Sequence, residues 1–331
     1  QTLIGTALDI SGDIDVDGTA NLDIIDVDGA ANFAADVTFA VGADIITASG
    51  GTGNLRLGED AGDAVTGNFN VLVGKDSGTA LEGGAGNVGL GYRTLYTSVA
   101  GDYNTAIGRE ALLTSNVSGN NYNTAVGAFA GKLVTTGVDN TIIGGLAGDA
   151  ITTGGNNTVL GKQALSADTK GGTAVAIGQL ALGAQNFTSA TDNYNVAVGY
   201  SAGVGITTGV QNTIIGGLAG DALTDADKNV AVGRSALTSD TLGSMSTAIG
   251  YSALDNQNFT SATNSRNTAV GHTAGLEGTT AVDNTLIGEQ AGYYITTGSK
   301  NTILGRHTGN AGGVDIRTAS NNIVLSDGDG N

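Results

Sequence analysis

A five-residue phrase recurs along residues 54–326: Asn, a β-branched residue, an apolar residue, then Ile, Val or Leu, and finally Gly. It reads N-T-A-I-G at 104–108, N-T-I-I-G at 140–144 and N-T-I-L-G at 301–305. A short β-branched run that closes on glycine is typical of a strand entering a turn. The pattern therefore predicts one short strand per repeat.

The spacing of the closing glycines predicts the architecture. The step from one closing glycine to the next is 17 in most places, 16 once, 19 once and 21 three times. A 72-residue superperiod is superimposed, so that Q-N-F-T-S-A-T at Gln185 recurs at Gln257. Fixed periods of this length are typical of solenoids. We therefore predict an all-β fold, a parallel β-solenoid or β-roll of about 16 coils.

The two faces of the predicted strand are both apolar. Side chains alternate across a strand, so the second and fourth residues of the phrase share one face. These residues are mostly β-branched, and we expect them to line the inside of the coil. The third residue then points outward, and a strand that is apolar on both faces is usually covered on both. The predicted intersubunit face of an oligomer consists of Ile142, Val159, Ile214, Leu286 and Ile303.

Asn opens 14 of the 16 copies of the phrase, the exceptions being Ala174 and Ser246. Stacked Asn side chains can hydrogen-bond along the stack or cap a turn, and glycine allows turn conformations with positive φ. We assign both residue types a structural role. The predicted columns include Asn104, Asn123, Asn140, Asn157 and Asn212, with Gly108, Gly127, Gly144, Gly161 and Gly216.

Residues 1–50 lack the glycine phrase and carry I-D-V-D-G at 14–18 and again at 25–29. Asp-Gly between alternating apolar residues indicates a strand and a tight turn. We therefore predict two parts, an N-terminal β shaft or neck in residues 1–50 and the solenoid in residues 51–331.

Composition narrows the functions that the chain can have. It contains 56 glycines, no Pro and no Cys, and its net charge is −18. This charge opposes binding to nucleic acid and to anionic membranes, and no run of 18 apolar residues is present for membrane insertion. A 17-residue coil encloses only its own side chains. Function is therefore expected on the outer surface or at the ends of the solenoid.

Motifs that could support chemistry are few and incomplete. D-I-D-V-D-G at 13–18 resembles the opening of a calcium loop, but Ile24 stands where the loop needs Glu. The two histidines, His272 and His307, fall on different repeats at expected surface positions. We predict no catalytic residue, no metal site and no cofactor, and hence no enzyme. Ice binding is a distant alternative, because the recurring T-T-G skips the Ala-Leu coils.

Insertions of two or four residues recur at every fourth coil. Loops with aromatic residues are typical contact sites, although tolerated surface loops or packing at a subunit seam explain them as well. The candidate contact residues are Phe187, Tyr194, Phe259, Arg266 and Tyr122.

The N-T-A-I-G phrase is similar to the N-S-V-A-I-G repeat of trimeric autotransporter adhesin heads, whose coils are usually shorter. I-S-G-D-I-D-V-D-G at 10–18, followed by the N-T-x-x-G arrays, resembles phage tail fibres. This resemblance implies a homotrimeric, extracellular tail fibre of the virion. It also implies that the fibre presents a surface for a host receptor, such as a glycan, and contacts other tail or fibre proteins. A bacterial trimeric surface adhesin head or extracellular filament, located on the cell surface, is the alternative.

Overall fold

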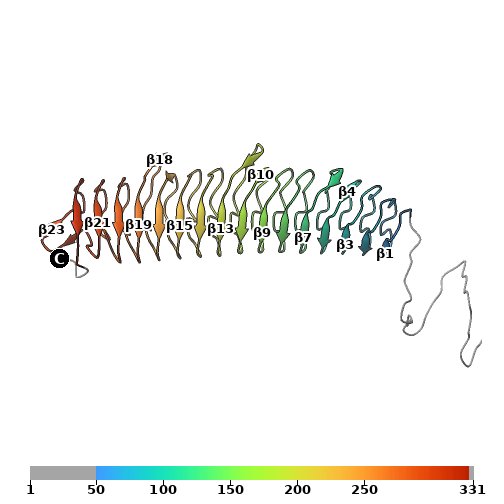
Figure 1. Cartoon of the computed structure of the whole chain (residues 1–331), viewed down its shortest axis with the longest axis horizontal. Coiled ribbons are helices and arrows are strands. Elements are labelled where there is room, and N and C mark those ends of the chain that lie inside the picture. The colour runs from blue at the N-terminus through green and yellow to red at the C-terminus, as the bar shows by residue number, and fades with distance from the viewer. Residues whose placement is uncertain (1–49, 328–331) are drawn as a thin grey trace, which may run out of the picture. The chain divides into compact units, whose positions relative to one another are not determined.

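The computed structural model describes residues 50–327, so the predicted shaft lies outside the described residues except for residue 50. Within residues 50–327 there is no helix, and short strands alternate with turns in a regular row of coils (Figure 1). The prediction of an all-β solenoid with about 16 coils is confirmed. The 17-residue spacing is confirmed as well, since Asn157 bonds to Asn140 at the equivalent position of the coil before it.

One strand from each coil joins a 16-stranded parallel sheet. The coils stack residue for residue: Thr141 pairs with Thr158, Ile142 with Val159 and Ile143 with Leu160. Equivalent positions of the phrase therefore form straight columns along the sheet. The strands are β1 (Leu55–Leu57), β2 (Val71–Val73), β3 (Val88–Leu90), β5 (Thr105–Ile107), β7 (Thr124–Val126), β8 (Thr141–Ile143), β9 (Thr158–Leu160), β11 (Val175–Ile177), β13 (Val196–Val198), β14 (Thr213–Ile215), β15 (Val230–Val232), β17 (Thr247–Ile249), β19 (Thr268–Val270), β20 (Thr285–Ile287), β21 (Thr302–Leu304) and β24 (Ile323–Leu325).

The sequence insertions form small additional strand pairs. Three pairs are parallel, and they lie at the upper edge of the coils in Figure 1, shortly before the main-sheet strands in the sequence. The fourth pair is an antiparallel hairpin near the C-terminal end. Their strands are β4 (Gly101–Asp102) with β6 (Gly119–Asn120), β10 (Gly171–Gly172) with β12 (Thr191–Asp192), β16 (Gly243–Ser244) with β18 (Thr263–Asn264), and β22 (Asn310–Ala311) with β23 (Val314–Asp315).

The two faces of the main sheet are the reverse of those predicted. The proposed intersubunit residues Ile142, Val159, Ile214, Leu286 and Ile303 are at most 2% exposed and lie inside the coil. The reason is the Asn that precedes 14 of the 16 strands of the main sheet. Its amide bonds to neighbouring coils from the inside, and side-chain alternation then turns the third residue inward as well. The second and fourth residues face outward.

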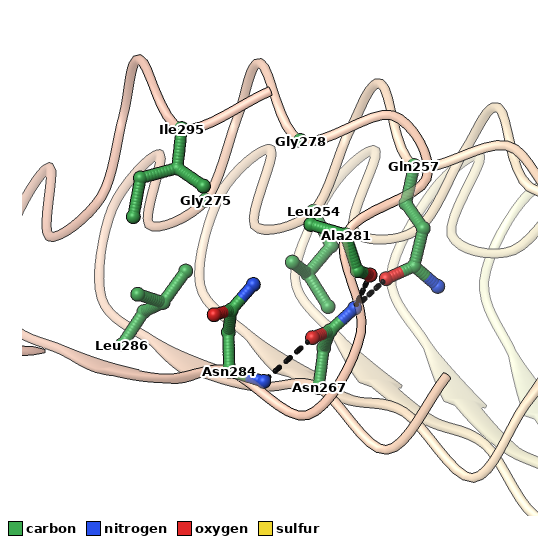
Figure 2. A pocket seen from close by; sticks show the side chains of 9 residues that line it. All are labelled: Leu254, Gln257, Asn267, Gly275, Gly278, Ala281, Asn284, Leu286 and Ile295. Atoms are coloured by element: carbon green, nitrogen blue, oxygen red, sulfur yellow. Dashed lines mark hydrogen bonds between the residues drawn. The ribbon is translucent and has the colours of Figure 1, made fainter. Parts of the chain in front are cut away.

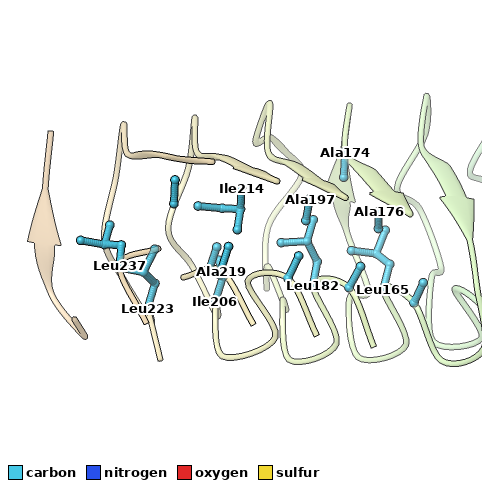
Figure 3. Close-up of a cluster of buried hydrophobic side chains, with 14 of the residues drawn as sticks. Leu165, Ala174, Ala176, Leu182, Ala197, Ile206, Ile214, Ala219, Leu223 and Leu237 are labelled. Carbon is cyan, nitrogen blue, oxygen red and sulfur yellow. The ribbon is translucent and has the colours of Figure 1, made fainter. Parts of the chain in front are cut away.

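The interior is filled in two complementary ways, which explains the alternation of Ala-Gly and Ala-Leu after the strands. In an Ala-Leu coil the leucine itself points inward, as Leu182 and Leu237 do in Figure 3. In an Ala-Gly coil an apolar residue three positions later fills the same space. A Cβ on Gly220 would lie 2.9 Å from Cδ1 of Leu223, so glycine leaves the room that the Leu223 side chain fills. Packing density thus selects the residue after each alanine.

The Asn column forms a buried hydrogen-bonded ladder. Asn140 Oδ1 accepts a hydrogen bond from the backbone N–H of Asn157 at 3.0 Å, and Asn140 Nδ2 donates to the carbonyl of Gly154 at 3.0 Å. Asn123, Asn157 and Asn212 repeat the pattern. Each side chain therefore bonds along the stack and also fixes a turn of the next coil.

Candidate functional surfaces

A void enclosed by the C-terminal coils is too small for a ligand. This void of about 10 Å³ lies between Leu254, Gln257, Asn267 and Leu286, and there Asn267 bonds to Gln257 and Asn284 (Figure 2). That volume is about the space of one water probe. Among residues 50–327, no group of three or more His, Cys, Asp or Glu is placed to hold a metal ion. Nor does any helix of sufficient length and apolarity to cross a membrane occur there.

Two buried carboxylates bridge the interruptions of the Asn ladder at Ala174 and Ser246. Asp240 Oδ1 accepts the backbone N–H groups of Gly243 and Phe259, each at 3.0 Å. Its Oδ2 accepts Nε2 of Gln257 at 2.6 Å, and Gln257 in turn accepts Nδ2 of Asn267 at 2.8 Å. Asp168 and Gln185 make the equivalent bridge one superperiod earlier. The hydrogen-bonded column thus continues where its Asn is missing.

Burial raises the pKa of the Asp240 carboxyl, although hydrogen bonds from Gln257 and backbone N–H groups oppose the rise. The folded state therefore retains a proton over a pH range in which the unfolded state has lost it. The stabilising contribution of Asp240 is complete below the unfolded pKa and falls as pH rises through the folded pKa. We expect the stability of the native chain relative to Asp240→Asn, measured by urea unfolding, to decrease as the pH rises above the unfolded pKa of about 4. A pH-independent difference would contradict this assignment.

The insertion loops carry two aromatic rings that were predicted as contacts and are instead buried. Phe187 and Phe259 are 5% and 6% exposed. Each backbone N–H is held by a buried carboxylate, Asp168 or Asp240. Each ring lies against a glycine, with Cδ2 of Phe187 2.8 Å from the position of a Cβ on Gly171. These two rings therefore anchor the loops to the solenoid and are unsuited to binding a partner.

The other predicted contact residues are exposed. Tyr194 is 56% exposed, and Tyr122 stacks on Tyr103 with 5.4 Å between ring centroids. Arg266 forms a bidentate ion pair with Asp283 at 2.6 and 3.1 Å. These residues all precede the ladder position of their coil and have positive φ, so they line one edge of the main sheet. They are not gathered into one site.

The two histidines lie in different environments. His272 is exposed and stacks on Tyr251, with 5.2 Å between ring centroids. His307 is 1% exposed, so the predicted surface position is wrong for this residue. Its Nδ1 accepts the N–H of Gly309 at 3.1 Å, which fixes the start of the β22–β23 hairpin region. Burial in a local turn explains the difference.

The outward-facing side of the main sheet, termed here the outer sheet face, is uncharged over all 16 strands. Its fourth-position column is entirely apolar, and nine of the 16 second-position residues are Thr. It is formed by the second and fourth residues of each phrase. Leu160, Ile215 and Ile287 are 45%, 38% and 39% exposed. The fourth-position column is Leu57, Val73, Leu90, Ile107, Val126, Ile143, Leu160, Ile177, Val198, Ile215, Val232, Ile249, Val270, Ile287, Leu304 and Leu325. The second-position column is Leu55, Val71, Val88, Thr105, Thr124, Thr141, Thr158, Val175, Val196, Thr213, Val230, Thr247, Thr268, Thr285, Thr302 and Ile323.

Beside this face runs a row of residues that immediately follow the closing glycines, termed here the glycine-following edge. The edge consists of Glu59, Lys75, Tyr92, Arg109, Ala128, Gly145, Lys162, Gln179, Tyr200, Gly217, Arg234, Tyr251, His272, Glu289 and Arg306. It holds five of the 13 Lys and Arg residues of the chain but only two of its 31 Asp and Glu residues. The edge is therefore locally cationic on an acidic protein. Sequence reasoning missed it, although the fixed offset from each glycine was a readable signal.

No protein-family model, no curated protein and no solved structure matches this chain. Assignment of a function therefore depends on the surfaces described above and on the sequence resemblance.

Proposed function

We propose that this chain is a structural and adhesive module of an extracellular homotrimeric fibre, specifically of a phage tail fibre that presents a surface to a host receptor. The observation that carries the proposal is the outer sheet face. Soluble monomers rarely expose a continuous apolar patch of more than a few hundred Å². Since the interior of each coil is closed, the chain acts through its surface.

The dimensions of the outer sheet face suit a second and third copy of the same chain. Sixteen strands at a spacing of about 4.8 Å give a strip about 70 Å long, and three residues give a width of about 10 Å. The area is about 700 Å² per copy, close to the roughly 800 Å² per partner of a stable interface. Association of flat, uncharged columns would cover this strip without burying an unpaired charge.

The sequence resemblance to phage tail fibres favours a tail fibre over other extracellular fibres. The alternative is a bacterial trimeric surface adhesin head or filament. The genes and domains beside this sequence distinguish the two. A baseplate or chaperone gene next to it favours the tail fibre, and a downstream membrane-anchor domain favours the adhesin. Ice binding loses support, because the fourth-position column of the outer sheet face contains no Thr.

The oligomer is tested by light scattering. We expect a mass of about 98 kDa, three times the chain mass of 32.5 kDa. The double variant Ile143→Asp/Ile215→Asp places charges on the outer sheet face, and we expect a folded chain of 32.5 kDa, because each buried carboxylate would lack a partner.

The matched control is Thr136→Asp/Thr153→Asp, which adds the same charge at exposed turn residues away from the main sheet. It should keep the mass of the native chain. A native chain that scatters as a monomer at all concentrations would refute the trimer. A double variant in the sheet face with unchanged mass would refute the outer sheet face as the interface of the trimer.

A further inference from the structure

Six side chains of the N-terminal coils form a continuous ladder of rings and cations, termed here the aromatic–cation ladder: Tyr96, Arg93, Tyr92, Arg109, Phe129 and Lys132. The Arg93 guanidinium lies 4.9 Å from the ring centroid of Tyr96 and 5.1 Å from that of Tyr92. Arg109 lies 5.9 Å from Tyr92 and 5.3 Å from Phe129. Lys132 follows at 5.0 Å from Phe129. The ladder spans three successive coils along the solenoid.

Two carboxylates bond to the cations of the ladder and hold them in place. Asp76 accepts a hydrogen bond from Arg93 Nε at 3.1 Å. Glu110 is buried and accepts Lys132 Nζ at 2.9 Å and Arg109 Nε at 3.3 Å. These contacts hold the pKa of Glu110 below its usual range, with the Lys132 bond as the largest cause. Asp149 also interacts electrostatically with Lys132, so three carboxylates lie beside the three cations. The excess of positive charge belongs to the glycine-following edge, which includes Tyr92 and Arg109, on a chain whose net charge is −18.

We propose that the aromatic–cation ladder binds an anionic linear polysaccharide, through ring stacking on the sugars and guanidinium contacts to their carboxylates. This inference rests on the proposed adhesive function and names its ligand class. The apolar faces of sugar rings stack on aromatic side chains, whose amphipathic rings suit such contacts. Arg presents a planar fork that matches a carboxylate. The exposed side chain of Arg109 keeps donors free beyond its single bond to Glu110.

A second, separate group of ring and cation contacts lies further along the solenoid. On the same glycine-following edge, Arg234 lies 5.8 Å from the ring of Tyr251, and Tyr251 stacks on His272. A duplex nucleic acid carries one negative charge per about 1.7 Å, which the surrounding acidic surface would repel. A uronate chain carries fewer charges and offers sugar faces for the exposed rings. The edge therefore favours the polysaccharide.

The test uses the full chain with two probes, polygalacturonate and its fully methyl-esterified form, by titration calorimetry. We expect binding to polygalacturonate that weakens with added salt, and little binding to the ester. Arg109→Gln removes one charge-assisted contact and is expected to weaken binding roughly tenfold. Glu110 keeps its bond to Lys132 in this variant, so the coil retains its local support.

The matched control is Lys228→Gln, which removes the same charge from an exposed residue at the opposite edge of the sheet. Its affinity should stay within about twofold of the native value. An equal loss of affinity in Arg109→Gln and Lys228→Gln would contradict the assignment of this site. Binding of the methyl ester as tight as that of polygalacturonate would also contradict it. A lower mass for Arg109→Gln would also overturn it, by assigning the ladder to the subunit seam. A native trimer that does not bind polygalacturonate contradicts this inference alone, whereas a native monomer contradicts the proposed function.

Discussion

Replacement of Gly144 by alanine is expected to lower the free energy of unfolding by about 3 kcal/mol or more. Gly144 has a φ of +135°, a conformation that side chains rarely adopt. A Cβ there would lie 2.6 Å from the carbonyl oxygen and 2.7 Å from the carbonyl carbon of Gly161 in the next coil. The obstacle is backbone that is fixed by the ladder of parallel pairs, so it cannot move without disturbing both coils.

The adjacent residue provides the control. A Cβ on Gly145 would have its nearest neighbour at 4.0 Å, the carbonyl oxygen of Ala128, and Gly145→Ala should change stability by less than about 0.5 kcal/mol. Gly216 and Gly217 repeat this pair one superperiod later. Urea unfolding of the four variants would measure both effects. Similar stabilities for Gly144→Ala and Gly145→Ala would show that the coils are not held at this spacing.

The second large expected effect is a difference in stability between two variants, one at an inward-facing and one at an outward-facing residue of the same strand. Ile214→Asp is expected to destabilise the solenoid by about 5 kcal/mol, since it removes a fully buried side chain and buries a carboxylate in its place. Ile215→Asp should leave the coils folded, because this residue is 38% exposed on the outer sheet face. Circular dichroism and protease resistance at low protein concentration would distinguish the two variants.

Ile214 and Ile215 are adjacent and have the same side chain. The two variants therefore have the same composition and differ only in which of the two neighbouring residues is replaced. The sequence interpretation made the opposite assignment, with Ile214 between subunits and Ile215 inside. A resistant Ile214→Asp variant together with a degraded Ile215→Asp variant would restore that interpretation and contradict the structure.

The repeat could be predicted from the sequence because each coil bonds mainly to equivalent residues of its neighbours. Spacing alone therefore predicts the parallel register and the number of coils. The orientation of the strands could not be obtained in the same way, since both faces of the phrase are apolar. The buried Asn determines the orientation of the strand. Asn140 points into the coil, and because side chains alternate along a strand, Ile142, two residues later, points inward as well.

Other features depend on contacts between residues with no shared pattern. Asp168 and Asp240 occupy equivalent positions of the superperiod, each before a missing Asn, and this coincidence could have indicated a replacement. The burial of Phe187 could not be predicted, because its ring occupies space left by Gly171 in another coil. The aromatic–cation ladder likewise joins residues from three coils, and sequence distance conceals it.

The residue-for-residue stacking of the coils means that the length of the solenoid can change in whole units. Each coil interacts with its immediate neighbours, as in other repeat proteins. A gain or loss of one superperiod, a block of four coils, preserves the Asp–Gln bridge, the succession of Ala-Gly and Ala-Leu coils and the register of the sheet. Recombination between such blocks would lengthen or shorten the solenoid by about 19 Å per block. The length of the solenoid can thus change between generations in steps of one block, while the contacts between neighbouring coils stay the same.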